Sequence, residues 1–326
     1  MTLTVDAAGD SGMRAVVVRS FGGPEVLRLE QVQRPDPIPT QVLVRVVAAG
    51  VNPIDAKTRS GGGFAAEAGQ LPHIPGWEFS GVVEKTGFGV TRFRPGDEVF
   101  GMPFFPRPAR AYAEYVTAPS RQLALKPANL THAQAAGLPL AGLTAWQLLA
   151  DTARVSPGQR VLIHAAAGGV GHLAVQIARA RGAYVIGTAS SAKHDLVTGL
   201  GAHEVIDYTA AAFEEAAGIV DVVVDLVGGD TRLRSLDVQR EGGLLLPVPR
   251  GLDVSQEAAR RGIAVLPMIV EPDYRALEEL AAMARSQALS IRVETVLPLE
   301  QAAQAHQAME SGHATGKTVL RVAAEP

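Results

Sequence analysis

A glycine-rich turn is the segment of this sequence whose residue types point most directly to chemistry. Residues 161–173 read VLIHAAAGGVGHL, an apolar strand that leads through closely spaced glycines into a helix. Gly168 lets the backbone approach a pyrophosphate, Gly171 allows close packing of helix on strand, and the amides at the helix N-terminus face the anionic phosphates. Because Ala166 replaces the usual first glycine, a purely structural packing turn remains the alternative. We predict dinucleotide binding at Ala167, Gly168, Gly169 and Val170.

The residues after the next strand indicate which dinucleotide is bound. A site for NAD carries an acidic residue about 20 positions beyond the glycines, where it holds the ribose 2′-hydroxyl. Residues 187–194 read GTASSAKH and contain no acid. The hydroxyls of Ser190 and Ser191 and the ammonium of Lys193 suit a 2′-phosphate, which a carboxylate would repel. A serine that only caps the following helix is the alternative. We expect NADP(H) as the cofactor.

Alternating strands and helices from Thr131 onward position both of these segments. Such alternation predicts right-handed crossovers and a parallel sheet covered on both faces, an α/β doubly wound fold. The predicted strands are residues 160–165, 184–188, 204–207, 220–226, 243–247 and 263–268. The predicted helices are residues 132–149, 172–181, 193–200, 210–217 and 230–236.

The first third of the chain has a different pattern, typical of a compact β-barrel-like domain. Short runs rich in β-branched residues are separated by Gly and Pro turns, and they predict strands at residues 14–18, 27–32, 41–48, 81–85 and 113–117. The tail predicts helices at residues 274–285 and 299–311 and strands at 293–297 and 318–322. We interpret this tail as returning to the first domain.

Composition excludes several classes of protein. The 326 residues suggest two domains, and 30 basic against 33 acidic residues give no electrostatic case for binding nucleic acid or an anionic membrane. The absence of Cys excludes disulfides, iron–sulfur clusters and thiolate zinc sites. The eight His lack tight metal spacing, so we expect them to be solvated or at helix ends, with no metal bound. Residues 1–12 read as a disordered leader without a signal peptide, which favours a cytoplasmic location.

Seven short motifs in order carry a resemblance that covers residues 13–322. They are FGGPEVL at 21–27, AGVNPIDAK at 49–57, PGWEFSGVV at 75–83, GDEVFG at 96–101, GLTAW at 142–146, AAGGVG at 166–171 and GK at 316–317. In these motifs the chain resembles the medium-chain dehydrogenase/reductase superfamily, in its zinc-free NADPH quinone oxidoreductase and enone reductase branch.

The resemblance implies a Rossmann doubly wound sheet inserted into a GroES-like β-barrel domain. Residues 13–131 and 288–326 would form the GroES-like substrate and catalytic domain, and residues 132–287 the Rossmann NADP-binding domain. It also implies a homodimer, joined edge to edge through the last Rossmann strand at residues 262–267. Zinc-dependent relatives carry a Cys at the position of Asn52 and a His at the position of Trp77, and neither replacement is a usual zinc ligand.

Asn52 is the first candidate for positioning the cofactor or the substrate. Its amide can both donate and accept a hydrogen bond beside the nicotinamide ribose. A turn residue preceding Pro53 is the alternative. Lys57 either donates to an enolate oxygen or is a solvated charge, and Asp55 either orients Lys57 or, as we favour, caps the local helix. By resemblance, further cofactor contacts fall at Thr144, Tyr208, Leu226, Val227, Val248 and Lys317.

The function expected from these features is NADPH-dependent, metal-free reduction of a quinone or of an activated C=C bond in an enone or alkenal. Conjugation in such substrates carries the charge after hydride delivery, while the protein supplies orientation and hydrogen-bond donors. A small, planar, apolar substrate would be enclosed by Trp77, Phe104 and Phe105. Core packing is the alternative for Trp77. The alternative function is an NADPH-binding redox sensor or structural protein without significant turnover.

Overall fold

The computed structural model describes residues 12–312 and 315–325. Within them the chain forms two compact units. The first unit contains the residues up to Leu143, Glu271–Gln287 and the tail from Ile291, and the second contains Thr144–Val270 and Ala288–Ser290. The predicted leader lies outside the described residues except for Gly12, which begins a strand.

The first unit is built on a seven-stranded sheet and a separate two-stranded hairpin. The sheet has the order β14-β15-β3-β4-β5-β7, with β6 pairing to β3, and β1 pairs antiparallel with β2. The strands are β1 Gly12–Val18, β2 Leu27–Gln33, β3 Gln41–Val51, β4 Phe79–Thr86, β5 Glu98–Gly101, β6 Tyr115–Pro119, β7 Leu123–Leu125, β14 Val293–Pro298 and β15 Lys317–Arg321. Because β15 inserts between β14 and β3, the prediction that the tail returns to the first domain is confirmed.

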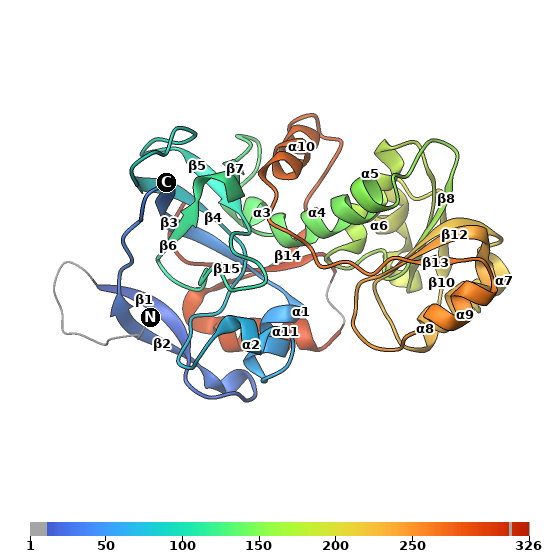
Figure 1. The fold of residues 1–326 in the computed structure, drawn as a ribbon, viewed down its shortest axis with the longest axis horizontal. Helices are drawn as coiled ribbons and strands as arrows, with labels where there is room; N and C mark the ends of the chain where they lie inside the picture. The colour runs from blue at the N-terminus through green and yellow to red at the C-terminus, as the bar shows by residue number, and fades with distance from the viewer. Residues whose placement is uncertain (1–11, 313–314, 326) are drawn as a thin grey trace. The chain divides into compact units, whose positions relative to one another are not determined.

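Short helices complete the first unit. They are α1 Pro53–Arg59, α2 Ala65–Ala68, α3 His132–Ala136, most of α4 Pro139–Trp146, α10 Tyr274–Arg285 and α11 Ala302–Glu310. Helices α1 and α11 lie side by side although more than 200 residues separate them (Figure 1). A segment from the first part of the chain and one from its tail therefore pack together beside Asn52.

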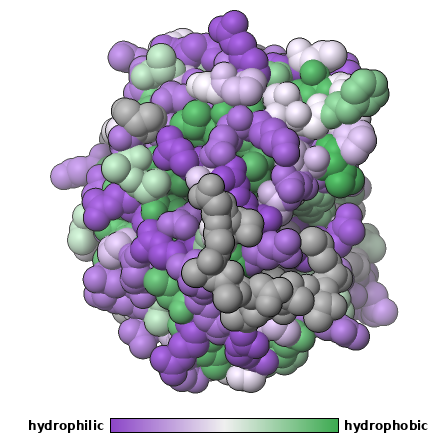
Figure 2. Space-filling model, turned by 90° about the vertical axis from the view of Figure 1, so that its left-hand side faces the viewer, coloured by the Kyte–Doolittle hydropathy of each residue, from purple (hydrophilic) through white to green (hydrophobic). Residues whose placement is uncertain are grey.

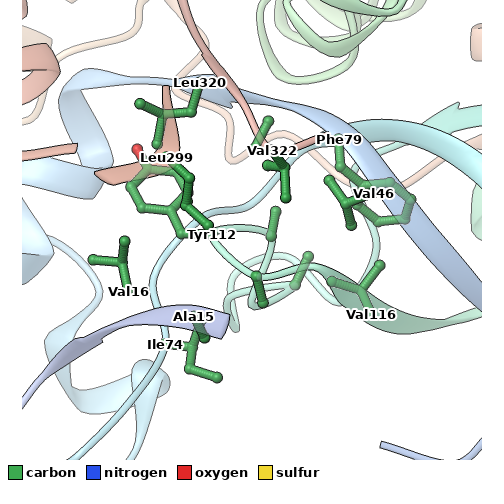
Figure 3. Packing of buried hydrophobic residues seen from close by; sticks show 14 of the residues in the cluster. Ala15, Val16, Val46, Ile74, Phe79, Tyr112, Val116, Leu299, Leu320 and Val322 are labelled. Carbon is green, nitrogen blue, oxygen red and sulfur yellow. The ribbon is translucent and has the colours of Figure 1, made fainter. Parts of the chain in front are cut away.

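The core of the first unit joins the hairpin, the sheet and the tail. Figure 3 shows the ring of Tyr112 beside Leu299 and Leu320, while Phe79 lies beside Val46. These side chains are at most 1 % exposed. Burial of apolar surface from both ends of the chain thus stabilises the unit as one body.

The second unit confirms the predicted doubly wound sheet. Six parallel strands have the order β10-β9-β8-β11-β12-β13. In Figure 1 helices α5 and α6 lie on one side of these strands and α8 and α9 on the other. The strands are β8 Arg160–Ile163, β9 Tyr184–Ala189, β10 Glu204–Asp207, β11 Val220–Asp225, β12 Gln239–Pro247 and β13 Ala264–Val265, and the helices are α5 Gly171–Ala180, α6 His194–Gly199, α7 Phe213–Ala216, α8 Asp230–Arg234 and α9 Ser255–Arg260.

Several predicted elements have other bounds in the structure. The helix predicted over residues 132–149 is two helices, α3 and α4, because Gly137 caps the first and Pro139 begins the second, where its missing N–H costs nothing. A π-helical stretch, Gln147–Thr152, follows them. The strand predicted at 263–268 is only Ala264–Val265, and the helix predicted at 210–217 is only Phe213–Ala216.

The boundaries between the two compact units differ from the predicted domain boundaries. Residues 132–143 and 271–287 pack with the first unit, where α3 contacts β3 and α10 contacts β7. The predicted boundaries after residues 131 and 287 follow the change of sequence pattern, and they stay a prediction.

The face of the molecule in Figure 2 carries hydrophilic residues with hydrophobic ones scattered among them. Among the described residues, no helix combines the length and the apolar character needed to cross a membrane.

Candidate active site

The glycine-rich turn joins β8 to α5 in the second unit. Ala165 adopts a left-handed φ of 49°, and its carbonyl accepts from the Gly168 amide at 2.9 Å. A Cβ on Gly171 would lie 2.2 Å from the Ala165 oxygen, whereas one on Gly168 would lie 3.2 Å from it. Gly171 is therefore required by the backbone itself, and the turn delivers the amides of a ten-residue helix to the end of the sheet. This geometry fits the phosphates of a dinucleotide.

Thr188 at the end of β9 holds the beginning of the turn. Its Oγ1 accepts from the Ala165 amide at 3.2 Å, and its carbonyl accepts from the Ala166 amide at 3.0 Å. His164 lies against the same hydroxyl at 3.3 Å and against Ser235 Oγ at 2.9 Å. Burial lowers the pKa of His164 to about 4, so this imidazole stays neutral at physiological pH.

Most of the predicted cofactor residues lie at one edge of the parallel sheet. Since all six strands run in the same direction, the residues that follow them share the carboxyl edge, where the order reverses between β8 and β11. The predicted residues found there are Ala167, Gly168, Gly169 and Val170 after β8, Ser190, Ser191 and Lys193 after β9, Tyr208 after β10, Leu226 and Val227 after β11, and Val248 after β12. Thr144 lies instead in α4, where it is buried.

Asp207 is an acidic residue at this edge that no sequence motif singles out. It pairs with Ala189 in the register of β10 and β9, one position before Ser190. Its carboxylate accepts from the Thr209 amide at 2.9 Å and from the Thr209 hydroxyl at 2.6 Å. These bonds, with a smaller contribution from Ser191, hold the pKa of Asp207 below its usual range. The alignment of neighbouring strand ends is the signal that would have found it.

A buried ion pair shapes the loops after β11 and β12. Asp225 Oδ1 accepts from the amides of Val227 at 3.0 Å and Gly228 at 2.7 Å, and its Oδ2 accepts from Arg232 Nε at 2.7 Å. Arg232 also donates to the carbonyl oxygens of Pro249, at 2.5 Å, and Leu252, at 2.8 Å. The pair therefore fixes both loops that carry the predicted cofactor residues at this side.

In the first unit, Asn52 is surrounded by charged groups. Its Nδ2 donates to Glu78 Oε1 at 2.7 Å, and its Oδ1 accepts from the ammonium of Lys317. Lys317 and Glu78 form an ion pair at 3.0 Å with side chains 2 % and 0 % exposed. Asn52 and Lys317, predicted separately, are thus brought together, while Glu78 is a partner that sequence reasoning missed.

Asp55 caps α1, as favoured from the sequence. Its Oδ2 accepts from the Asn52 amide at 2.7 Å, and the side chain is fully buried. Burial raises the pKa of Asp55 to about 8, with the neighbouring Glu78 adding to the rise and bonds from the backbone opposing it. A buried carboxyl group that is mostly protonated at neutral pH therefore lies in hydrogen-bond contact with the backbone of Asn52.

A chain of hydrogen bonds extends from Tyr112 to the surface. The Tyr112 hydroxyl lies 3.1 Å from His306 Nε2, and His306 Nδ1 lies 3.2 Å from Arg59, which pairs with Glu310 at 2.8 Å. Since Arg59 only donates, Nδ1 accepts and Nε2–H donates to Tyr112. Burial, aided by Arg59, lowers the pKa of His306 to about 3. The expectation that histidines are solvated or at helix ends is wrong for His73, His164 and His306, because all three are buried away from helix ends.

Lys57 and Trp77, two other predicted residues, differ in their exposure to solvent. Lys57 is exposed on α1, and among the described residues no ion pair holds its ammonium. Trp77 is fully buried, with its Nε1 donating to the Pro106 carbonyl at 3.2 Å and its ring tilted against Phe105. Core packing therefore accounts for Trp77.

In the described part of the chain, no three His, Asp or Glu side chains gather as a metal site.

A doubly wound sheet with a phosphate-type turn, joined to a β unit with a buried polar centre, defines a nucleotide-dependent dehydrogenase or reductase. The family model for "Alcohol dehydrogenase GroES-like domain" matches residues 38–128, and that for "Zinc-binding dehydrogenase" matches residues 200–320. The chain is 36% identical to the NADPH-dependent alkenal/one oxidoreductase, chloroplastic, of Arabidopsis thaliana, over 98% of this chain and 82% of that protein.

Solved structures of similar proteins agree with this result. The quinone oxidoreductase of Coxiella burnetii is 39% identical with a TM-score of 0.90, covering 95% of this chain and 99% of that one. The Escherichia coli quinone oxidoreductase complexed with NADPH is 30% identical with a TM-score of 0.85, covering 95% and 100%. The chain belongs to the medium-chain dehydrogenase/reductase superfamily, in its quinone oxidoreductase and enone reductase branch.

Proposed function

We propose that this protein reduces quinones, or the activated C=C bonds of enones and alkenals, with NADPH. The observation that carries the proposal is the glycine turn at the carboxyl edge, followed at the next strand by hydroxyl groups and a lysine. The names of the Arabidopsis relative, an NADPH-dependent alkenal/one oxidoreductase, and of the Coxiella quinone oxidoreductase support the same chemistry. The E. coli relative was solved with NADPH.

Different residues bind the pyrophosphate, the 2′-phosphate and the nicotinamide of NADPH. The amides of Ala167, Gly168, Gly169 and Val170 hold the pyrophosphate, and the side chains of Ser190, Ser191 and Lys193 hold the 2′-phosphate beside the exposed ring of Tyr208. On the nicotinamide side, Thr144, Leu226, Val227 and Val248 line the cofactor.

When bound, NADPH supplies a hydride to the β-carbon of the enone or to the quinone. Asn52 orients the reacting groups through its amide, whose position is fixed by Glu78 and Lys317. The ammonium of Lys57 donates a hydrogen bond, and then a proton, to the oxygen on which negative charge develops. Asn52 and Trp77 offer no thiolate, imidazole or carboxylate, so conjugation of the substrate and these donors stabilise the charge.

The proposal is tested by NADPH oxidation with a panel of quinones, 2-alkenals and enones. We expect turnover with at least one acceptor and, for Lys57→Met, a fall in kcat of about 10²-fold with enones because the proton donor is lost. Micromolar NADPH binding without turnover on any acceptor would instead establish the sensor or structural alternative. Equal affinity for NADPH and NADH would refute the part given to Ser190 and Lys193.

A homodimer and a cytoplasmic location also belong to the proposal. The homodimer is supported by the position of β13 at the edge of its sheet, and the mass of the protein in solution tests it. Fractionation of cells that express the full chain tests the location.

A further inference from the structure

The amide of Asn52 is held between groups of opposite charge. Nδ2 donates to the Glu78 carboxylate at 2.7 Å, and Oδ1 accepts from the Lys317 ammonium. If the amide rotated by 180°, its NH2 group would face the ammonium and its oxygen would face the carboxylate. Both contacts would then be repulsive, and both lie where water is excluded. The ion pair therefore permits a single orientation of Asn52.

The ion pair is fixed by the fold around it. Glu78 Oε2 accepts from the Leu140 amide at 2.7 Å, at the beginning of α4. A Cβ on Gly50 would lie 2.2 Å from Glu78 Oε1, so glycine is required there for the carboxylate to fit. Lys317 begins β15, which pairs with the end of β3 directly before Asn52. Three separate segments thus determine where the two charges lie.

We infer that Glu78 and Lys317 are positioning residues that act through Asn52, an inference that rests on the proposed function. The second Nδ2 hydrogen of Asn52 has no partner within the described residues, and the ion pair fixes the direction in which it is offered to the nicotinamide ribose or the substrate. Lys317, expected from the sequence as a direct cofactor contact, is 3 % exposed and already bound to Asn52 and Glu78. Its part is to orient Asn52.

Kinetics of neutral variants test this inference. The double variant Lys317→Met/Glu78→Gln removes both charges without leaving one buried alone, which the single variant Lys317→Met would do. We expect kcat to fall at least tenfold and the isotope effect with 4-deuterated NADPH to rise, because hydride transfer slows. The Kd of adenosine 2′,5′-bisphosphate, which probes only the phosphate end of the site, stays within twofold. Lys85→Met, at an exposed ion pair with Asp36, is the matched control and retains wild-type kcat.

Coupling with Asn52 separates positioning from a general structural role. In an Asn52→Ala background, the same double substitution should cost less than a further twofold in kcat, since the residue through which the pair acts is already gone. A fully additive loss, or a kcat within twofold of wild type for Lys317→Met/Glu78→Gln alone, would overturn the inference.

A readout that needs no turnover distinguishes failure of this inference from failure of the proposed function. The side-chain amide of Asn52, assigned by its disappearance in Asn52→Ala, should show in ¹⁵N-resolved NMR one proton shifted downfield by Glu78. We expect that shift to vanish in Lys317→Met/Glu78→Gln, and an unchanged resonance overturns the inference. If the wild type shows the shift but reduces no acceptor, the proposed function fails while the orientation of Asn52 stands.

Discussion

Asp55 is a carboxyl group that the folded protein holds away from water. Burial raises its pKa to about 8, against an ordinary value of 3.8, so the folded state binds the proton more tightly than the unfolded state. The contribution of Asp55 to the free energy of unfolding is therefore highest below pH 4 and falls as the pH rises to about 8, by up to about 1.4 kcal/mol per pH unit. Asp55→Asn does not titrate, so it should gain stability relative to wild type over this range.

Urea unfolding of both proteins between pH 5 and pH 9 measures this difference. The control is Asp36→Asn, since the Asp36 side chain is 83 % exposed and its ion pair is with Lys85 on the surface. Its unfolding free energy should follow that of wild type at every pH. Parallel curves for Asp55→Asn and wild type would show that Asp55 is ionised throughout.

Individual residues were predictable where the motif itself carried the chemistry. Asn52 was found because the motif at residues 49–57 carries the family resemblance and its amide can both donate and accept, and Asp55 lies in the same motif, where a helix cap was favoured. The pairing of Lys317 with Asn52 joins residues 265 positions apart, and depends on the insertion of β15 between β14 and β3. No local pattern contains that information, so Glu78 and the true surroundings of Lys317 were missed.

The turn between β8 and α5 has no room for a side chain at Gly171. A Cβ on Gly171 would lie 2.2 Å from the Ala165 oxygen and 2.8 Å from Ala166 Cα. Both are backbone atoms, so no side-chain rotation can relieve the clash. Gly171→Ala should therefore cost about 1–3 kcal/mol of stability and raise the Kd for NADPH at least tenfold. Gly199→Ala in α6, where nothing lies within 4 Å, is the control and should be neutral or slightly stabilising. Fluorescence titration with NADPH and thermal unfolding decide between these outcomes.

The loops after β11 and β12 depend on the Asp225–Arg232 pair. Arg232→Ala leaves a fully buried carboxylate and two carbonyl groups without their donor, so we expect a loss of about 3–5 kcal/mol of stability. The matched substitution Arg240→Ala breaks a half-exposed pair with Asp221 and should cost less than about 1 kcal/mol. Denaturant unfolding compares the two variants, and equal losses would contradict the structural importance of the buried pair.

Elements with strong patterns were predicted well, and short or interrupted ones were not. The continuous apolar run of β11 and the glycine-to-helix step into α5 predicted both correctly. Residues 132–149 looked like one helix because their apolar spacing continues across Gly137 and Pro139, whose backbone preferences break it. Residues 263–268 are apolar enough for a strand, yet only Ala264 and Val265 pair with β12, because pairing depends on a tertiary neighbour.

At the scale of the whole molecule, the edge strand β13 bears on assembly. β13 pairs with β12 on one side, and no described strand pairs with its other side. The surrounding residues 263–270 read IAVLPMIV, and an apolar edge with unpaired backbone groups is a template for another strand. The Leu266 amide donates to Leu245 in β12, so by alternation the Val265 amide points away from β12. Pairing of two copies through this edge is expected.

Val265→Pro tests that dimer without disturbing the bonds to β12. Proline removes the outward amide and is tolerated at a sheet edge, so the variant should fold and elute as a monomer of 34.1 kDa. Val265→Ala keeps the amide and should remain at twice that mass, like the wild type. Light scattering coupled to size exclusion gives the masses, and circular dichroism checks the fold. A monomeric wild type at micromolar concentration, or a Val265→Pro protein that stays dimeric, would show that β13 does not join two copies.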